Sequence, residues 1–286
     1  MNKVAVIMVG FILLLIVACG SQGEKTGSYN FKQGVGELQF RFLENAPPEK
    51  IYPNSNFKIV LEADNLAAYD VVNLQVAILG LDQTYFEISP SEQKVERLVG
   101  RSLTAPGGDK QFLEFDGQSK SISPQAFEYR APFFLKTEYR STFEFVDTIC
   151  LNPNVYAIYD AGCKPDTQKS FSGQGAPVGV NRMEEIISPG AGAKVEFRLF
   201  ITNLGKGKVK TLTVGKGELG GKPLLCVFQR AEDPTGKKVQ LGTEAQEATL
   251  ICTASLEDSQ SYKTTLAVDF SYDYEFIEPQ ELALVR

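Results

Sequence analysis

Alternation of apolar and polar residues runs through Val195-Glu-Phe-Arg-Leu-Phe-Ile-Thr-Asn-Leu204. A period of two is typical of a β-strand with one face buried in a core. The earlier stretch Phe57-Lys-Ile-Val-Leu-Glu-Ala-Asp-Asn-Leu66 aligns with it without a gap. The alignment places Asn65-Leu66 on Asn203-Leu204, so the two strands are expected to end in the same kind of turn.

Two further matches indicate that a whole unit is repeated. Continuing the alignment places Val71, Leu74 and Val76 on Val209, Leu212 and Val214. Later, Tyr139-Arg-Ser-Thr-Phe-Glu-Phe145 is similar to Tyr262-Lys-Thr-Thr-Leu-Ala-Val268. Matches in the same order predict two copies of one β-domain. The alternative is chance, since many alternating strands look alike.

The turn residues favour a sandwich in each copy. Short strands broken by Gly, Pro and Asn are typical of sandwiches rather than of βαβ units. Pro189-Gly-Ala-Gly192, followed by Lys194–Gly207, resembles the opening hairpin of immunoglobulin-like surface domains of the cell-adhesion-related, CARDB-like kind. That resemblance implies a seven-stranded sandwich with a spacer or adhesive role, and it transfers no catalytic residue. The first copy fits more loosely, because Ala67-Ala68 replaces the glycines.

The amino terminus predicts export. Met1-Asn-Lys3 precedes an apolar run from Val4 to Ile16, which has the layout of a secretory signal and is short for a membrane span. Ile16-Val-Ala-Cys19 resembles the lipobox of prokaryotic lipoprotein precursors. The resemblance implies that Cys19 is acylated and holds the chain on the extracytoplasmic face of a cell membrane. An uncleaved amino-terminal anchor is the rival interpretation.

The predicted organisation is all-β, with two tandem immunoglobulin-like sandwiches after an N-terminal signal helix. One helical turn at Glu184–Ile187 is the sole helix expected after the signal. Gly and Pro in the connector favour a domain boundary there. The predicted segments are a signal peptide at 1–18, a flexible tether at 19–36, sandwich 1 at 37–150, a connector at 151–178 and sandwich 2 at 179–286.

Composition excludes several functional classes. The chain has 286 residues, 43% of them hydrophobic, which is enough for packed cores. A net charge of −6 argues against nucleic acid as a partner. Histidine is absent, which removes the usual general base near neutral pH and the usual zinc or copper ligand. Chemistry based on carboxylates alone or on a Ser-Lys pair stays open.

The remaining four cysteines predict disulfides. An exported chain is oxidised, and four cysteines allow three connectivities. Cys150–Cys163 and Cys226–Cys252 are favoured, because each pair falls within one structural unit. Free buried thiols are the alternative. A metal site is disfavoured because no Cys-x-x-Cys pair occurs.

Tyr272 and Tyr274 are the candidate ligand-binding residues. They lie on one face of a predicted strand with Phe270 and Phe276, and such rows can stack on sugars or anchor a protein. The alternative is that the row fills a core. Gly217–Pro223 does not fit a phosphate loop. A solvated acidic face is favoured over a calcium site for a set of acidic residues, namely Asp64, Asp70, Asp269, Asp273, Glu275 and Glu278.

The sequence therefore predicts a non-enzymatic, lipid-anchored cell-surface protein that acts as a binding, adhesion or assembly module. A protein partner at the cell surface is expected, with no metal and no cofactor. The first alternative is a glycan- or solute-binding lipoprotein that presents its ligand to a membrane complex. The second is a carboxylate-dependent hydrolase, for which no local pair of carboxylates stands out.

Overall fold

The computed structural model describes residues 30–153, 162–189, 192–242, 246–256 and 260–286. Within it, Phe31–Arg286 forms one compact unit. The predicted signal peptide at 1–18, Cys19 and tether residues 19–29 lie outside the described residues. In the part of the chain that is described, no helix is long and apolar enough to cross a membrane.

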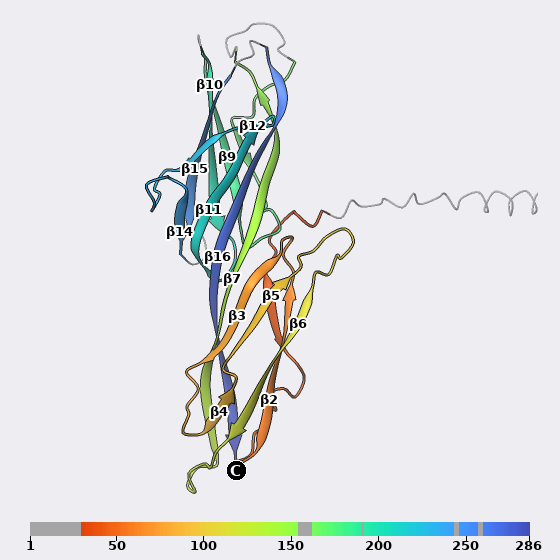
Figure 1. Cartoon of the computed structure of the whole chain (residues 1–286), viewed down its shortest axis with the longest axis vertical. Helices are drawn as coiled ribbons and strands as arrows, with labels where there is room; N and C mark the ends of the chain where they lie inside the picture. Colours follow the sequence, from red (N-terminus) through yellow and green to blue (C-terminus); the bar gives the residue numbers. More distant parts are fainter. Residues whose placement is uncertain (1–29, 154–161, 190–191, 243–245, 257–259) are drawn as a thin grey trace, which may run out of the picture. The chain divides into compact units, whose positions relative to one another are not determined.

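All regular secondary structure of the described residues is β-strand, which confirms the all-β prediction (Figure 1). The strands form three sheets. The N-terminal sheet has the order β1 (Leu38–Phe42), β2 (Asn56–Asn65), β6 (Lys110–Ser119), β4 (Phe86–Ser89). The C-terminal sheet has the order β13 (Leu225–Phe228), β15 (Glu247–Ser255), β10 (Lys194–Asn203), β9 (Val178–Ser188), β8 (Gln168–Ser170).

The central sheet takes part in both sandwiches. Its order is β12 (Lys222–Pro223), β11 (Lys208–Leu219), β16 (Tyr262–Val285), β7 (Glu128–Leu151), β3 (Val71–Leu79), β5 (Glu92–Leu98), and β14 (Lys238–Leu241) also pairs with β11.

Strands β7 and β16 form the axis of this sheet. Each has 24 residues, and they pair antiparallel along their whole length (Figure 1). At the middle of this ribbon, Arg140 lies opposite Asp273, and their side chains form an ion pair of 2.8 Å. On one side of this midpoint β3 pairs with β7, and on the other side β11 pairs with β16. The ribbon therefore contributes one half of its length to each sandwich.

The two halves of the chain have the same strand order. In the first half, β1-β2-β6-β4 form one sheet while β3 pairs with β5 and β7. In the second half, β9-β10-β15-β13 form one sheet while β11 pairs with β14 and β16. This correspondence supports the repeat predicted from the two aligned strands, which are β2 and β10.

Each sandwich is completed by a strand segment from the other half. The first half ends with β7, and the strand beside it in the first sandwich is the later part of β16. The second half ends with β16, and the strand beside it in the second sandwich is the later part of β7. The boundaries at 37–150 and 179–286 stay a prediction, since pairing along the ribbon crosses them and Phe31–Arg286 is one unit.

The cores lie between the sheets, on the inward faces that the alternation of the strands creates. Phe197, Leu199 and Ile201 are fully buried in the second sandwich, as Ile59 and Leu61 are in the first. Side chains from facing sheets meet in ring contacts. Phe40 of β1 lies 5.8 Å from Phe276 of β16, and Phe145 of β7 lies 5.0 Å from Phe171, measured between ring centroids.

The predicted cysteine pairs both lie at disulfide distance. The Sγ atoms of Cys150 and Cys163 are 2.07 Å apart, and those of Cys226 and Cys252 are 2.04 Å apart. The first pair ties the connector to the end of β7. The second joins directly opposed residues of β13 and β15. Closing such loops typically stabilises a domain by about 3 kcal/mol each.

The predicted helical turn at Glu184–Ile187 is wrong. These residues belong to β9, where Glu184 lies opposite Arg198 and Ile187 lies opposite Val195. The two glutamates and two isoleucines resemble one helical turn in isolation. Pairing with the neighbouring strand β10 overrides this weak local preference.

The second sequence match is out of register. Val76 lies opposite Thr137 and the aligned Val214 lies opposite Phe270, so Tyr139 corresponds to Tyr272 and not to Tyr262. A shift by an even number of positions keeps every side chain on its own face of the sheet. The alternation of the sequence therefore could not distinguish the two registers.

Candidate functional site

Both tyrosines predicted as ligand-binding residues lie in the core. Tyr272 and Tyr274 are each 2% exposed, and their rings pack against Tyr139 at centroid distances of 6.4 and 5.4 Å. The hydroxyl of Tyr274 accepts a hydrogen bond of 2.7 Å from the Gly207 N–H. Burial raises the pKa of Tyr272. Neither ring presents a face to solvent, so the row does not form an exposed platform for a sugar.

Several of the acidic residues considered for calcium form ion pairs instead. Among the described residues, no group of three or more Cys, Asp or Glu side chains is placed to hold a metal ion. Asp64 lies 3.0 Å from the Lys110 Nζ, and Asp70 lies 2.5 Å from an Arg97 guanidinium nitrogen. Asp70 is partly exposed, as expected for a solvated acidic face, whereas Asp64 is buried at 8% exposure.

The most distinctive surface is a row of apolar side chains on the outer face of the central sheet. Leu79, Phe134 and Pro279 are direct partners on β3, β7 and β16. Leu79 and Phe134 are 44% and 46% exposed, and Ile277, one step along β16, is 53% exposed. We call these four residues the apolar row. A contiguous group of exposed apolar side chains is a candidate interaction site.

Strand alternation places these side chains outside. Phe133 and Leu135 are 1% exposed and point into the core, so Phe134 between them points outward. The side chains of Phe134 and Phe133 thus lie on opposite faces of the same strand. Gly80 follows Leu79, and a Cβ there would lie 3.3 Å from the Phe134 ring. The chain turns away at this point and leaves the ring uncovered.

Pro279 occupies a position where its missing N–H costs little. Beyond Glu275, β16 is an edge strand, because β11 no longer pairs with it. The Val285 N–H donates a hydrogen bond to the Ile51 carbonyl, and the Ala283 carbonyl accepts one from the Ile51 N–H. Odd-numbered residues of this part of β16 therefore direct their backbone N–H and C=O groups away from β7. Pro279 shares this orientation. A proline at such an edge also removes a donor that a foreign strand would need.

Ion pairs border the apolar row on two sides. Toward the middle of the ribbon, the Lys210 Nζ lies 2.8 Å from Glu138, and Lys136 lies 3.3 Å from Glu275. The hydrogen bond from Lys210 is the main reason that the pKa of Glu138 falls to about 2. Toward the end of the ribbon, Arg130 pairs with Glu281 at 2.8 Å. The apolar row therefore has the polar rim that protein interfaces show.

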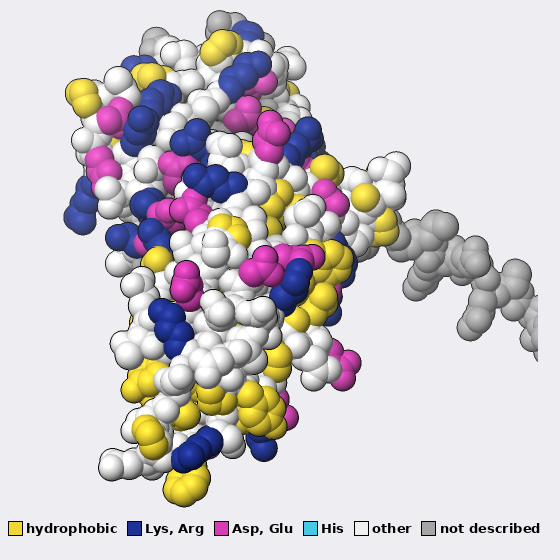
Figure 2. Space-filling model, turned by 60° about the horizontal axis from the view of Figure 1, so that its bottom comes forward, with side chains coloured by type: hydrophobic (Ala, Val, Ile, Leu, Met, Phe, Trp, Pro, Cys, Tyr) yellow, Lys and Arg dark blue, Asp and Glu magenta, His cyan; other side chains and the backbone are white. Residues whose placement is uncertain are grey.

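The opposite face of the first sandwich differs in character. The outer face of the N-terminal sheet carries Arg41–Glu62, Lys58–Glu114 and Lys110–Asp64 ion pairs. Figure 2 shows apolar side chains gathered toward the end of the molecule that comes forward, with paired basic and acidic side chains elsewhere on the same view. The two faces of one sandwich are thus suited to different surroundings.

A groove continues the apolar row around the edge of the sandwich. It has a volume of about 550 Å³ and lies between the ends of β3 and β4. Its apolar wall is formed by Ile78, Leu79, Leu81, Phe86 and Ile88. Leu79 belongs to both surfaces, so the groove and the apolar row adjoin.

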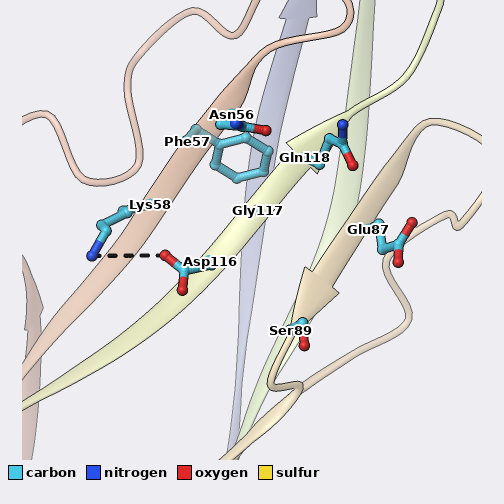
Figure 3. A pocket seen from close by; sticks show the side chains of 8 residues that line it. All are labelled: Asn56, Phe57, Lys58, Glu87, Ser89, Asp116, Gly117 and Gln118. Carbon is cyan, nitrogen blue, oxygen red and sulfur yellow. Dashed lines mark ion pairs between the residues drawn. The ribbon is translucent and has the colours of Figure 1, made fainter.

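A second pocket lies beside β4, and several polar side chains are among the residues that line it (Figure 3). Its volume is about 450 Å³, and Figure 3 shows Asn56, Gln118 and Glu87 around it. Phe57 lies opposite Gly117, and a Cβ on that glycine would come within 2.4 Å of the Phe57 ring. The ring therefore fills the space that the glycine leaves.

Comparison with known proteins yields distant structural similarity. No protein-family model matches the sequence, and no curated protein matches it. Among solved structures, the chain is similar to a Salmonella enterica SafA pilin in complex with the SafB chaperone, at 9% identity and a TM-score of 0.21, covering 78% of this chain and 98% of that one.

Two adhesin structures show similarly low sequence identity and TM-scores. The CupB6 tip adhesin from Pseudomonas aeruginosa matches at 5% identity and a TM-score of 0.19, covering 86% of this chain and 94% of that one. The collagen adhesin from S. aureus matches at 11% identity and a TM-score of 0.18, covering 89% and 88%. Similarity at this level assigns no function to the chain.

Sequence reasoning missed the apolar row. Its signal was the run Pro132-Phe133-Phe134-Leu135, in which both faces of the strand are apolar. Continuous apolarity on a strand indicates that both faces are covered. On β7 the inward face is covered by the core, whereas the outward face at Phe134 is half exposed.

Proposed function

We propose that this chain is a non-enzymatic, lipid-anchored cell-surface protein that binds a protein partner through the apolar row. The observation that carries the proposal is the exposed alignment of Leu79, Phe134 and Pro279 across three strands. Burying the exposed half of a phenylalanine contributes about 1–2 kcal/mol to binding. The apolar row would thus supply the apolar centre of an interface, and the ion pairs around it would supply the rim.

The rigidity of the first sandwich favours this surface over the loops. The apolar row lies on paired strands, two of which run on into the second sandwich. A binding surface on rigid strands loses little conformational entropy when a partner docks. Substituting one outward side chain there should also leave the core unchanged.

The decisive experiment compares two phenylalanines of similar exposure. Phe134→Ser removes the centre of the apolar row, whereas Phe112→Ser changes a residue that is 51% exposed on the opposite sheet. Native membranes carrying each full-length variant would be cross-linked and the protein purified. We expect one stoichiometric partner that is lost with Phe134→Ser and kept with Phe112→Ser. Equal recovery with both variants would refute the role of this surface.

The lipid anchor rests on the sequence around Cys19. Acylation there would hold the folded unit at the extracytoplasmic face of a cell membrane, which fits an oxidised chain with two cysteine pairs. Mass spectrometry of the mature amino terminus tests this part separately. A mature terminus without acyl groups at Cys19 would refute the anchor and leave the partner-binding surface open.

A glycan-binding role is the second candidate, and the pocket beside β4 favours it. Amide and carboxylate side chains around a pocket of about 450 Å³ suit the hydroxyl groups of a sugar. A glycan array probed with the wild type and with Gln118→Ala separates the two candidates. Binding that Gln118→Ala abolishes and Phe134→Ser retains would replace the first proposal.

A further inference from the structure

A small cavity lies at the side of the molecule where β16 stops pairing with β11. It has a volume of about 260 Å³ and is bounded by β1, β7, β16 and the turn between β10 and β11. Drug-sized ligands usually occupy about 300–1,000 Å³, so this space suits a smaller molecule. We call it the waist cavity. It does not include any residue of the apolar row.

Aromatic rings form one part of its wall. Phe40, Tyr139, Tyr274 and Phe276 all line the cavity. Phe276 lies 5.8 Å from Phe40 and 6.3 Å from Tyr274, measured between ring centroids. Tyr139 and Tyr274 are buried, whereas Phe40 and Phe276 are partly exposed and supply the accessible rings. The electron-rich face of such a ring attracts a cation.

The charged side chains of the wall leave an excess negative charge. Glu37, Glu278 and Lys206 line the cavity, two acids against one base. No cation among the described residues forms an ion pair with either carboxylate within 4.0 Å. A ligand with a single positive charge would therefore balance the cavity.

The position of each carboxylate supports the binding of a cation in the cavity. Burial raises the pKa of Glu37, although the charge and the backbone N–H of Lys206 oppose the shift. A carboxylate that has lost water without gaining a full partner is stabilised by a cation. Glu278 belongs to the even-numbered residues of β16, which point toward the core, so its charge faces the gap between the sheets and not the solvent side.

Glycines of the β10–β11 turn shape the remaining wall. A Cβ on Gly205 would lie 2.4 Å from the Tyr274 hydroxyl and 3.0 Å from the Glu37 Oε2. In the first repeat the corresponding residue is Ala67, which is buried. The second turn therefore needs glycine because Tyr274, Pro177 and Glu37 occupy the space beside it.

We propose that the waist cavity binds a small organic cation of the alkylammonium class, with its charge held between Glu37 and Glu278 and its alkyl groups against the aromatic rings. Charge and aromatic surface recognise an ammonium group jointly, whereas an anion or a neutral polar molecule would satisfy neither. This site is independent of the proposed protein partner and of the lipid anchor.

The test uses choline, butylammonium and 3,3-dimethylbutan-1-ol, the last being a neutral molecule with the shape of choline. Each is titrated into the folded protein while the backbone amides of Lys206 and Gly207 are followed by NMR. We expect saturable shifts with at least one ammonium ion and none with the alcohol. Equal binding of the alcohol, or no saturable shift with either ammonium ion, would overturn the proposal.

Charge-removing variants test whether Glu37 and Glu278 bind the ammonium group. Glu278→Gln and Glu37→Gln should each weaken ammonium binding by about tenfold, which corresponds to about 1.4 kcal/mol. Glu96→Gln is the matched control, because Glu96 is an exposed carboxylate on β5 away from the cavity. Thermal unfolding establishes that each variant is folded. Unchanged affinity in both cavity variants would also overturn the proposal.

Discussion

Asn65 and Asn203 make the same three hydrogen bonds at equivalent turns of the two repeats. Each side-chain amide donates to the carbonyl four residues later, at 3.0 Å to Tyr69 and at 2.8 Å to Gly207. Each donates to a second carbonyl, that of Leu98 at the end of β5 and that of Gly242 just after β14. Each Oδ1 accepts from the N–H two residues later. Both asparagines are buried, at 0% and 1% exposure.

Asn203→Asp should destabilise the protein strongly. The substitution places a buried carboxylate against two carbonyl oxygens, which accept and cannot donate. We expect the free energy of unfolding to fall by about 3 kcal/mol, and Asn65→Asp to have an effect of similar size. Urea denaturation followed by circular dichroism measures both. The exposed Asn56→Asp is the control, and a loss as large there would show that the repeated hydrogen bonds do not carry the effect.

Leu284→Ala should loosen the first sandwich, although Leu284 belongs to the last strand of the second repeat. Leu284 is fully buried, lies opposite Tyr129 and bridges to Ile51. Truncating a buried leucine costs about 2–5 kcal/mol. Hydrogen exchange should accelerate in β2, β6 and the early part of β7 more than in β10 and β15.

The neighbouring Val285→Ala is the control for this experiment, because Val285 points outward and is partly exposed. It should leave the exchange pattern nearly unchanged. Faster exchange confined to β10 and β15 in Leu284→Ala would contradict the sharing of strands between the sandwiches.

The sequence predicted those features that depend on local pattern. Alternation in Phe57–Leu66 and Val195–Leu204 identified β2 and β10, and the shared Asn-Leu pair marked turns that prove equivalent in their hydrogen bonds. The pairing of Cys226 with Cys252 followed from their closeness in one repeat. Each of these inferences needs only neighbouring residues or a short loop.

The exchange of strands between sandwiches could not be predicted in the same way. Alternation shows which face of a strand is buried and does not show which strand lies beside it. Nothing in Phe276–Val285 distinguishes a strand that completes its own sandwich from one that completes the other. The waist cavity was missed for the same reason, since Glu37 and Glu278 come together only through this exchange.

Gly117→Ala should destabilise the first sandwich through overpacking. A Cβ at this position would lie 2.4–2.7 Å from three atoms of the Phe57 ring, which itself meets the ring of Phe86 edge-on. We expect a loss of about 1–3 kcal/mol. Gly107→Ala is the control, because no atom lies within 4 Å of a Cβ built there. Recovery of stability in Gly117→Ala combined with Phe57→Leu would establish the ring as the cause.

Glu185 should make stability depend on pH. This side chain is 5% exposed in β9, and its Oε1 has no hydrogen-bond partner among the described residues. Burial raises its pKa from 4.5 to about 7, with Lys169 opposing the shift and Asp166 and Asp147 adding to it. Between these two pKa values the folded state binds more protons than the unfolded state. The contribution of Glu185 to stability is therefore greatest below pH 4.5, and this contribution is lost as the pH rises through 7.

Glu185→Gln removes the charge and keeps the shape, so it should raise the free energy of unfolding at pH 8 by about 1–3 kcal/mol and flatten its dependence on pH between 5 and 8. The neighbouring Glu184 points outward and pairs with Arg182 at 2.8 Å. Because an exposed ion pair contributes little, Glu184→Gln should change stability by less than about 1 kcal/mol at either pH. Urea denaturation at several pH values measures both variants. If Glu185→Gln follows the wild type across this range, Glu185 is ionised in the folded protein and its burial does not control the titration.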